Sequence, residues 1–312
     1  MTSPGAAART RTRFAPSPTG DLHLGGAWTA LASWVVARRA GGVNLLRVED
    51  LDAPRVVRGS EEAIVEDLLW LGLGWDERMP RQSERSESYA RAVATLEARG
   101  LVYPCDCSRA EIALVAHAPH PGEESVYPGT CRDKDPARTM KRPPALRVRV
   151  PGANVSISFS DGALGAVSQN LAREVGDFVL RRGDGVYAYQ LAVMVDDAAG
   201  DVTDVVRGAD LLGSTARQIW LARQLGLAVP AYTHVPLVTG PDGSRLEKRS
   251  PSATVRGLRA AGVAPEQIVG RLAHGLGLVP EPAPMTAAEV AARSGSGEIA
   301  WRRAPWPYPA NW

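Results

Sequence analysis

The stretch RFAPSPTGDLHLGGA, residues 13–27, decides how the rest of this sequence is interpreted. Its composition predicts a short strand, a Pro/Gly turn and then a buried helix. In an open parallel sheet, ligands bind outside the carboxyl ends of the strands, where a helix N-terminus offers free N–H groups to a phosphate. Gly25 and Gly26 would let a nucleotide approach the backbone, and His23 could contact a phosphate. A Gly-rich turn with a surface histidine is the alternative interpretation of this stretch alone.

The alternation of strands and helices that begins here predicts an α/β fold with a parallel sheet. Strands are expected at 10–16, 43–50, 202–208 and 232–238, and helices at 23–42, 60–73, 84–99 and 210–225. Ser60 is the expected N-cap of its helix, because acidic residues follow it in the first turn. Further strands are expected at 145–150, 155–159, 177–182 and 185–190, and C-terminal helices at 252–261 and 265–276.

The bulk composition is that of a globular protein without a membrane segment. Hydrophobic residues make up 45% and charged residues 22% of the chain, and the formal net charge is only +2. No apolar run approaches the roughly 18 residues that span a bilayer, and the N-terminal residues lack the apolar core of a secretory signal. We therefore expect a cytoplasmic protein with no membrane partner.

The three cysteines of the chain, Cys105, Cys107 and Cys131, lie within 27 residues of one another. Their odd number argues against a disulfide framework, and their clustering indicates three thiolate ligands of a zinc site. A closed zinc site needs a fourth ligand. On ligand chemistry alone, His117 or His120 is favoured because imidazole binds zinc better than phenol does. Three unpaired thiols in a loop are the alternative.

A lysine-bearing loop, DGSRLEKRSPS at residues 242–252, stands out against the composition. The chain has 36 basic residues, of which only Lys134, Lys141 and Lys248 are lysines. This bias suggests that arginine has been taken wherever either residue serves, although lysine is a mobile point charge and arginine a rigid planar fork. Lys248 is explained either by chance or by a function that needs a cation able to swing toward a ligand.

These motifs, in this order, resemble those of the class I aminoacyl-tRNA synthetases, specifically the glutamyl branch. The matching segments are PSPTGDLH at 16–23, RVEDLD at 47–52, YAYQLAVMVDD at 187–197, VVRGADLL at 205–212 and RLEKR at 245–249. The resemblance covers about residues 11–260. It implies a Rossmann-like catalytic core that binds ATP through His23, Gly25, Gly26 and Lys248. It also implies that His23 and Lys248 act in catalysis.

The sequence departs from the family pattern at two places. Gly26 stands where a second histidine is common, and in the lysine loop Arg245 and Glu247 stand where lysine and serine are common. These departures keep open the alternative of an inactive zinc-containing RNA-binding module.

The resemblance also implies a glutamate pocket. The matching positions are Arg13, Phe14, Ala15, Pro16, Ser17, Glu49, Tyr189 and Arg207. A buried carboxylate must be paired, and arginine can clamp one with two hydrogen bonds, so Arg13 and Arg207 suit the carboxylates of glutamate. Glu49 suits the ammonium group, and the tyrosine could donate its hydroxyl. Asp196 and Asp197 could hold a metal or a ribose, or serve as helix caps or structural hydrogen-bond acceptors.

A family of short paralogues, the glutamyl-queuosine tRNA(Asp) synthetases, carries a Cys-x-Cys…Tyr-x3-Cys zinc site. Tyr127 and Cys131 stand at this spacing. The resemblance therefore implies a structural zinc ion held by Cys105, Cys107, Tyr127 and Cys131. Tyr127 thereby competes with the two histidines for the fourth position.

The length of the chain bears on the expected substrate. The 64 residues that follow Lys248 are too few for an anticodon-binding domain in addition to the expected helices. The resemblance then implies a monomeric, free-standing core that activates glutamate with ATP and Mg²⁺. The glutamate would be esterified to the cyclopentenediol of queuosine in the anticodon loop of tRNA(Asp). Alternatives are a truncated glutamyl-tRNA synthetase that charges the 3′ end of tRNA(Glu), and an adenylate-forming enzyme that uses a carrier protein or small amine.

We divide the chain into four segments on this basis. They are the first half of the catalytic domain at 1–103, a zinc-binding insertion at 104–144, connecting strands and the second half with the lysine loop at 145–250, and a helical C-terminal region with its tail at 251–312. The tail, WRRAPWPYPANW, is expected to be packed or disordered, with stacking on RNA as the alternative.

Overall fold

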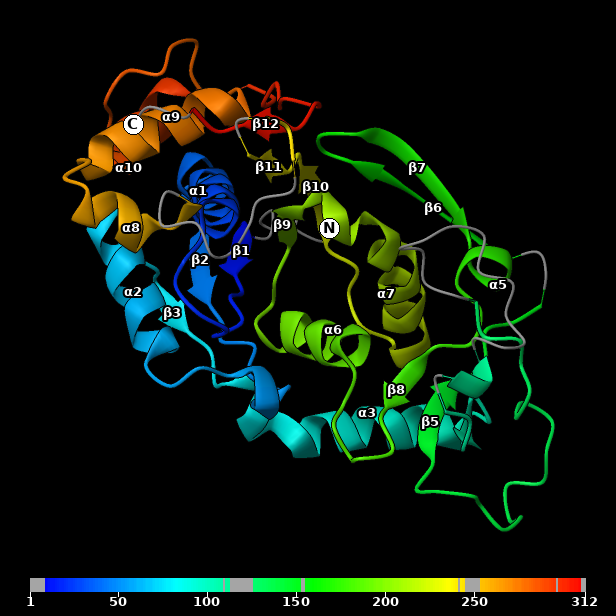
Figure 1. Cartoon of the computed structure of the whole chain (residues 1–312). Coiled ribbons are helices and arrows are strands. Elements are labelled where there is room, and N and C mark those ends of the chain that lie inside the picture. Colours follow the sequence, from blue (N-terminus) through cyan, green and yellow to red (C-terminus); the bar gives the residue numbers. More distant parts are fainter. Residues whose placement is uncertain are drawn as a thin grey trace, which may run out of the picture.

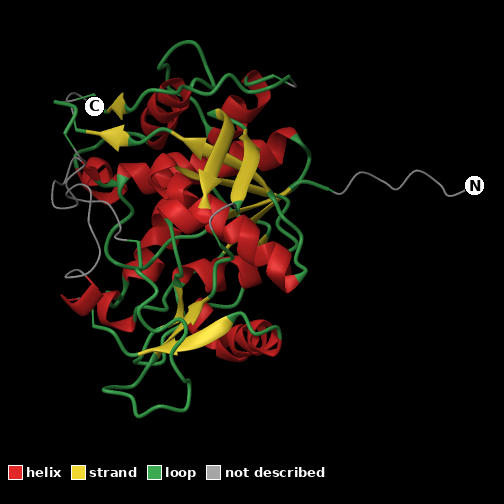
Figure 2. Cartoon of the chain, turned by 90° about the vertical axis from the view of Figure 1, so that its right-hand side faces the viewer, coloured by secondary structure: helices red, strands yellow, loops and turns green. Residues whose placement is uncertain are grey.

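The computed structural model describes residues 9–108, 110–112, 126–152, 155–240, 242–244, 253–295 and 297–309. Its centre is a parallel β-sheet with helices on both faces (Figure 1), which confirms the predicted α/β class. Figure 2 shows a smaller antiparallel sheet in the lower part of the view, apart from the central strands. Within these described ranges, no helix has the length and apolarity needed to cross a bilayer.

The order of the central strands reverses between β1 and β9. The five strands are β1 (Arg11–Phe14), β2 (Val43–Leu46), β3 (Glu77–Arg78), β9 (Asp204–Gly208) and β10 (Ala231–Val235). Parallel pairs join β1 to β2, β2 to β3 and β9 to β10. β1 lies beside β9, where the N–H of Thr203 donates to the carbonyl of Arg11 at 2.9 Å. The order β3-β2-β1-β9-β10 therefore has its switch point between β1 and β9, where sheets of this kind bind ligands.

Helix α1 (Leu24–Arg39) is buried on most of its circumference, because apolar residues occupy nearly all of its faces. One side covers the sheet and another packs against C-terminal helices (Figure 1). The helices that share this core are α2 (Ser60–Trp70), α8 (Val255–Ala260), α9 (Pro265–Leu276) and α10 (Ala287–Arg293). α9 has the predicted bounds because proline starts it and Gly277, with φ 85°, ends it.

A second hydrophobic core lies on the other face of the sheet. It contains residues from α3 (Ser86–Ala98), α6 (Tyr189–Ala199) and α7 (Leu212–Leu225). The fully buried Leu191 of α6 and the ring of Trp220 in α7 belong to it. α6 therefore spans from this core to the switch point, and its first and last turns both carry residues of the site described below.

Two further β structures flank the central sheet. They are the antiparallel hairpin of β6 (Ser156–Asp161) and β7 (Gly165–Asn170), and the antiparallel sheet of β4 (Val102–Cys105), β5 (Ala145–Val148) and β8 (Val179–Arg181). β6 also runs parallel to β10, which joins the hairpin to the central sheet. The cysteine-bearing insertion leaves the smaller sheet at the end of β4 and returns at β5.

Two local predictions are wrong. Ser60 is the first residue of α2, whose N-cap is Gly59 in the left-handed conformation with φ 80°. The Ser60 hydroxyl instead donates to the carbonyl of Gly20 at 2.6 Å and so ties α2 to the first turn. Residues 185–190 form an isolated bridge and then enter α6 at Tyr189, rather than a strand. The four-segment division of the chain remains a prediction.

The C-terminal tail packs against α1. Its strand β12 (Trp306–Pro307) pairs in parallel with β11 (Val238–Thr239), which precedes the lysine loop. The buried indole of Trp306 stacks on that of Trp28, with ring centroids 5.1 Å apart. A Cβ at Gly275 would lie 2.7 Å from both rings, so glycine is needed there. Stacking of Trp306 on RNA, one alternative for the tail, is therefore wrong.

We predict that Trp306→Ala lowers the unfolding temperature by about 5 °C or more, because it leaves a cavity against Trp28 worth about 3 kcal/mol. Thermal unfolding followed by circular dichroism measures this. Leu69→Ala, at a side chain that is 57% exposed, is the control and should shift the temperature little. Equal shifts in the two variants would contradict the packing role of the tail.

Candidate active site

The predicted site residues gather at the carboxyl ends of the central strands. Arg13 lies on β1, Arg207 on β9, and Tyr189 starts α6. Beyond the strands, residues 14–17 run beside residues 47–49, and the N–H of Glu49 donates to the carbonyl of Pro16 at 2.9 Å. The structure therefore brings the Arg13–Ser17 segment, Glu49, Tyr189 and Arg207 to the switch point of the sheet.

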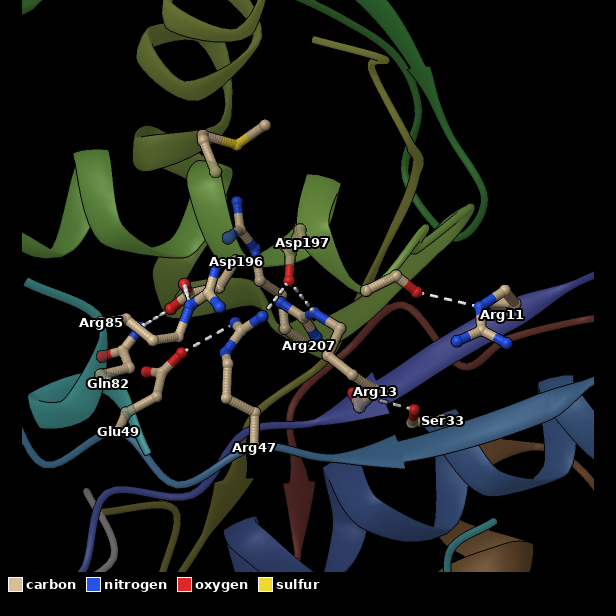
Figure 3. Close-up of polar contacts among 12 residues, drawn as sticks. Arg11, Arg13, Ser33, Arg47, Glu49, Gln82, Arg85, Asp196, Asp197 and Arg207 are labelled. Carbon is tan, nitrogen blue, oxygen red and sulfur yellow. Dashed lines mark hydrogen bonds and ion pairs between the residues drawn. The ribbon is translucent and has the colours of Figure 1, made fainter. Parts of the chain in front are cut away.

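A buried ion network crosses this region (Figure 3). One carboxylate oxygen of Asp197, on α6, accepts hydrogen bonds from Arg13 Nε at 3.1 Å and from Arg47 Nη1. Arg47 Nη2 donates to Glu49 at 3.0 Å. The side chains of Arg13, Arg47 and Asp197 are at most 4% exposed. Charges this deeply buried must be paired, so these contacts determine where Arg13 and Glu49 can lie.

The network shifts the protonation of its acidic members in opposite directions. Burial raises the pKa of Glu49 above its usual value, and Arg47 offsets only part of this effect. For Asp197, burial also acts to raise the pKa, but Arg13 and Arg47 outweigh it and hold the pKa below its usual range. The charged form of Asp197 is therefore favoured by its arginine partners, whereas the charged form of Glu49 would be favoured further by a cationic ligand.

The oxygen atoms of Asp196 are occupied, which corrects its interpretation as a metal or ribose ligand. This fully buried carboxylate accepts hydrogen bonds from Gln82 Nε2 at 2.8 Å, Arg85 Nε at 2.5 Å and the Tyr89 hydroxyl at 2.8 Å. Asp196 therefore has the structural role that stood as its other interpretation, because it ties α6 to α3. Asp197 binds both arginines through Oδ1, and its metal or ribose role stays a prediction.

Arg207 differs from the other arginines of the site. It is 4% exposed, yet among the residues that the structure describes no carboxylate lies within ion-pair distance of it. Its Nη1 atom points to the Tyr189 hydroxyl at 3.5 Å, and its guanidinium lies over the Tyr232 ring at 5.2 Å. A desolvated cation without a counter-ion is unfavourable, so this position attracts an anionic ligand.

A cavity of about 750 Å³ opens beside these residues. Ser17, Glu49 and Tyr189 line one part of it. Cys107 and Arg147, from the cysteine-bearing insertion and the smaller sheet, line another. The cavity therefore connects the ion network to the cysteine cluster and is larger than an amino acid requires.

The N-terminus of α1 provides the second part of the site. His23 is the N-cap of α1, and its Nδ1 atom accepts the N–H of Gly26 at 3.0 Å. A Cβ at Gly26 would lie 2.8 Å from Leu22 Cδ1, so packing against this side chain is one reason for glycine at the position. The residues that follow the lysine loop return here, because the N–H of Val255 donates to the carbonyl of Leu22 at 2.9 Å. Lys248, Arg245 and Glu247 lie outside the described residues.

The three cysteines form a compact cluster whose ligand atoms all lie within 4.8 Å of one another. Cys107 and Cys131 Sγ are 3.5 Å apart, and the Tyr127 hydroxyl lies 3.3 Å from Cys105 Sγ and 3.6 Å from Cys107 Sγ. Tetrahedral zinc–thiolate bonds place sulfur atoms about 3.8 Å apart, so this donor set fits a metal ion. Arg138 Nη2, at 3.3 Å from Cys131 Sγ, would help to neutralise the thiolates. His117 and His120 lie outside the described residues.

Comparison with known proteins agrees with this geometry. Residues 9–291 match the family described as tRNA synthetases class I (E and Q), catalytic domain. The glutamyl-Q tRNA(Asp) synthetase of Symbiobacterium thermophilum is 49% identical over 294 residues, which cover 89% of this chain and 90% of that protein. The protein of the same name from Geobacter sulfurreducens is 53% identical over 76% of this chain and 74% of its own length.

This chain belongs to the glutamyl-Q tRNA(Asp) synthetase family.

Solved structures place this family member beside the glutamate-tRNA synthetases. The Elizabethkingia anophelis enzyme superimposes with a TM-score of 0.82 at 28% identity, over 97% of this chain and 68% of its own. The Elizabethkingia meningosepticum enzyme, solved in complex with its amino acid, gives 0.80 at 28% identity, over 96% and 67%. The predicted resemblance to the glutamyl branch is therefore confirmed over almost the whole chain.

Arg47 is the site residue that the sequence analysis missed. The sequence does indicate that Arg47 is unusual, because it is an arginine between the apolar strand VNLL and Val48. An arginine in such a position must either reach solvent or find a buried carboxylate. In this glutamyl-Q synthetase family member it is fully buried and is shared between Asp197 and Glu49.

We predict that Arg47→Met destabilises the protein by about 3–5 kcal/mol, because it leaves Glu49 and part of the Asp197 charge buried without a partner. The unfolding temperature should fall by about 5 °C or more. Arg55→Met is the control, since Arg55 is 67% exposed and its ion pair with Asp52 is long, with 4.0 Å between Nε and Oδ2. Such an exposed pair contributes little to stability. A normal melting temperature for Arg47→Met would show that the network is not needed for stability.

Proposed function

We propose that this chain activates glutamate with ATP and transfers it to queuosine in the anticodon loop of tRNA(Asp). The charge balance of the switch-point pocket carries this proposal. Arg13, Arg47 and Arg207 contribute three positive charges, and Asp197 and Glu49 contribute two negative charges. Among groups in direct contact the pocket therefore has one positive charge in excess, on Arg207, since His234 separates Asp161 from Arg207. This excess complements glutamate, whose net charge is −1. The names of the relatives support the same substrates.

Each part of glutamate has a partner in this arrangement. The ammonium group would bind Glu49, because a cation beside this carboxylate favours its charged form and so opposes the burial that raises its pKa. The α-carboxylate must remain accessible to ATP at the start of α1. Arg207, which has no carboxylate partner among the described residues and lies beside the Tyr189 hydroxyl, would then take the side-chain carboxylate. Arg13 adds positive potential from its place next to Asp197.

Adenylate formation needs charge neutralisation rather than an enzyme nucleophile. An oxygen of the glutamate α-carboxylate attacks the α-phosphorus of ATP in line, and the bond to pyrophosphate breaks. The N-terminus of α1, with His23, Gly25 and Gly26, would bind phosphate through its dipole and through the N–H groups that the His23 side chain does not cap. Lys248 would move toward the transferring phosphate from its loop, and Mg²⁺ bound with ATP supplies further positive charge.

Transfer to tRNA uses the same cavity. A hydroxyl of the cyclopentenediol attacks the carbonyl of glutamyl-adenylate, an ester forms and AMP leaves. The cavity extends past the amino-acid pocket toward the cysteine-bearing insertion, which gives room for a nucleoside beside the adenylate.

We infer that the cysteine cluster holds zinc. Cys105, Cys107 and Cys131 would supply three thiolates and the Tyr127 oxygen the fourth ligand. Thiolates favour zinc over harder cations, and four protein ligands close the site to substrate. The bound ion would supply a structural cross-link between the turn after β4 and the residues around Cys131.

The experiment that tests the activity is transfer of radiolabelled glutamate, with ATP and Mg²⁺, onto purified tRNA(Asp) with and without queuosine, and onto tRNA(Glu). We expect label only on queuosine-containing tRNA(Asp). Lys248→Ala, which removes the mobile cation, should lose this label and the glutamate-dependent exchange of pyrophosphate into ATP. Label on the 3′ end of tRNA(Glu) would instead identify a short glutamyl-tRNA synthetase.

The fourth zinc ligand is tested with Tyr127→Phe. We expect the zinc affinity to fall by at least about tenfold, because replacing even an outer partner of a metal site costs that much. Metal analysis and competition with a chelator measure it. Tyr103→Phe is the matched control, since its buried hydroxyl donates to Asp177 at 2.7 Å. Unchanged affinity in Tyr127→Phe would give the fourth position to His117 or His120.

A further inference from the structure

A buried aspartate–histidine pair lies behind Arg207, and the proposed function assigns it no role. His234, on β10, and Asp161, at the end of β6, have fully buried side chains. His234 Nδ1 lies 2.5 Å from Asp161 Oδ2, and Arg207 Nε donates to His234 Nε2 at 3.1 Å. The three residues form a continuous chain of hydrogen bonds from the hairpin to the glutamate pocket.

The neighbours of His234 determine which ring nitrogen carries the proton. The Nε2 atom faces Arg207 Nε at 3.1 Å and Thr215 Oγ1 at 3.0 Å. A guanidinium can only donate, so Nε2 must present its lone pair, to which the Thr215 hydroxyl can also donate. The proton therefore resides on Nδ1 and is donated to Asp161. Burial lowers the pKa of His234, and this agrees with a neutral ring. A charged ring would direct an N–H group at Arg207.

Asp161 cannot turn away from His234. Its Oδ1 atom accepts the N–H groups of Ala163 and Leu164, both at 3.0 Å, and that of His234 at 3.2 Å. Only Oδ2 is directed at the imidazole ring. The turn between β6 and β7 thus holds the carboxylate in one orientation, and the carboxylate holds the ring in one tautomer.

This chain of contacts leaves one part of Arg207 for a ligand. Nε is bound to His234, and Nη2 donates to Thr215 Oγ1 at 2.8 Å. Nη1, directed at the Tyr189 hydroxyl at 3.5 Å, lies in a long and weak contact. A ligand carboxylate would meet Nη1 at the side of Tyr189, which also lines the cavity.

We propose that Asp161 and His234 are positioning residues that hold Arg207 so that Nη1 meets the side-chain carboxylate of glutamate. This inference rests on the proposed function, since it assigns the same pocket. Nη1 would make a charge-assisted hydrogen bond to the carboxylate of glutamate, whereas glutamine would offer it only a neutral amide oxygen. The pair therefore contributes to the affinity for glutamate and to its selection over glutamine, without touching either.

Asp161→Asn is the first test, because it keeps the shape of the side chain and reverses the tautomer. The three N–H groups retain the amide oxygen at the Oδ1 position, so the new NH₂ group faces His234 Nδ1. The ring proton must then move to Nε2, where it opposes the Nε–H of Arg207 and can be accepted only by Thr215 Oγ1, at 3.0 Å. We expect the KM for glutamate in pyrophosphate exchange to rise about tenfold or more, the KM for ATP to stay unchanged and the preference over glutamine to fall.

The matched control is Asp177→Asn. Asp177 is also almost fully buried and accepts Tyr103, Arg132 and the N–H of Val150. Its described hydrogen bonds include none to Asp161, His234 or Arg207. Asp177→Asn should therefore lose stability, because it weakens buried contacts, and keep the glutamate KM. If both variants change the glutamate KM equally, the effect is a general cost of burying asparagine, and the positioning role is wrong.

Two substitutions of His234 separate its contact with Asp161 from its contact with Arg207. His234→Asn places an amide near the Nδ1 position and keeps the contact with Asp161, whereas His234→Gln places an amide oxygen near Nε2 and can still accept from Arg207. The proposal expects a high glutamate KM for His234→Asn and partial rescue in His234→Gln. Equal values, or the reverse order, would overturn it.

A spectroscopic measurement keeps this inference separate from the proposed activity. Nitrogen-15 NMR of the histidine rings should show the Nδ1–H tautomer for His234 in the unaltered protein and the Nε2–H tautomer in Asp161→Asn. If the unaltered protein does not support glutamate-dependent exchange, the proposed function fails. The tautomers still test the hydrogen bonds that link Asp161, His234 and Arg207. An Nε2–H or charged ring in the unaltered protein, or an unchanged glutamate KM in Asp161→Asn, would overturn the inference.

Discussion

One carboxylate oxygen of Asp197 is the contact on which the site depends. It accepts hydrogen bonds from Arg13 on β1 and from Arg47 beyond β2, so two strands and helix α6 meet at a single atom. Burying three charges is tolerated only when each finds a partner, because the desolvation of an ion costs several kcal/mol. Glu49 extends the same network, whereas Arg207 stands outside it. The pocket therefore keeps an excess of positive charge that its own residues do not cancel.

The central elements of the fold could be predicted because local signals and tertiary packing agree there. The apolar strand before Arg47, the apolar helix α1 and the Pro/Gly boundaries of α9 are examples. The strand β7, with the sequence GAVSQN, carries no such signal and exists because it pairs with β6. β12 contains a proline and is held by β11 and Trp28. Such elements depend on partners far away in the chain, which local propensity does not reveal.

The site shows the same division. Residues within ordered motifs, such as His23, Glu49 and Arg207, could be named from the sequence because their spacing is distinctive. Arg47 acts through a residue 150 positions away, and His234 through one 73 positions away, so only the folded chain reveals their roles. The sequence left a structural role and a metal or ribose role open for Asp196 for a related reason, since the partners that give it the structural role come from α3 and the turn before it.

The packing of Trp306 on Trp28 has a consequence for synthesis of the chain. Protein chains emerge from the ribosome N-terminus first, so α1 appears early, yet much of its apolar surface is covered by α9, α10 and the tail. The nascent chain must therefore carry Trp28 and its neighbours uncovered until more than two hundred further residues have been made. The sheet can pair its strands earlier, but helix α1 becomes fully packed among the last events. Newly made molecules thus pass through a period in which they need protection from aggregation, and chaperones that bind apolar helices would recognise them then.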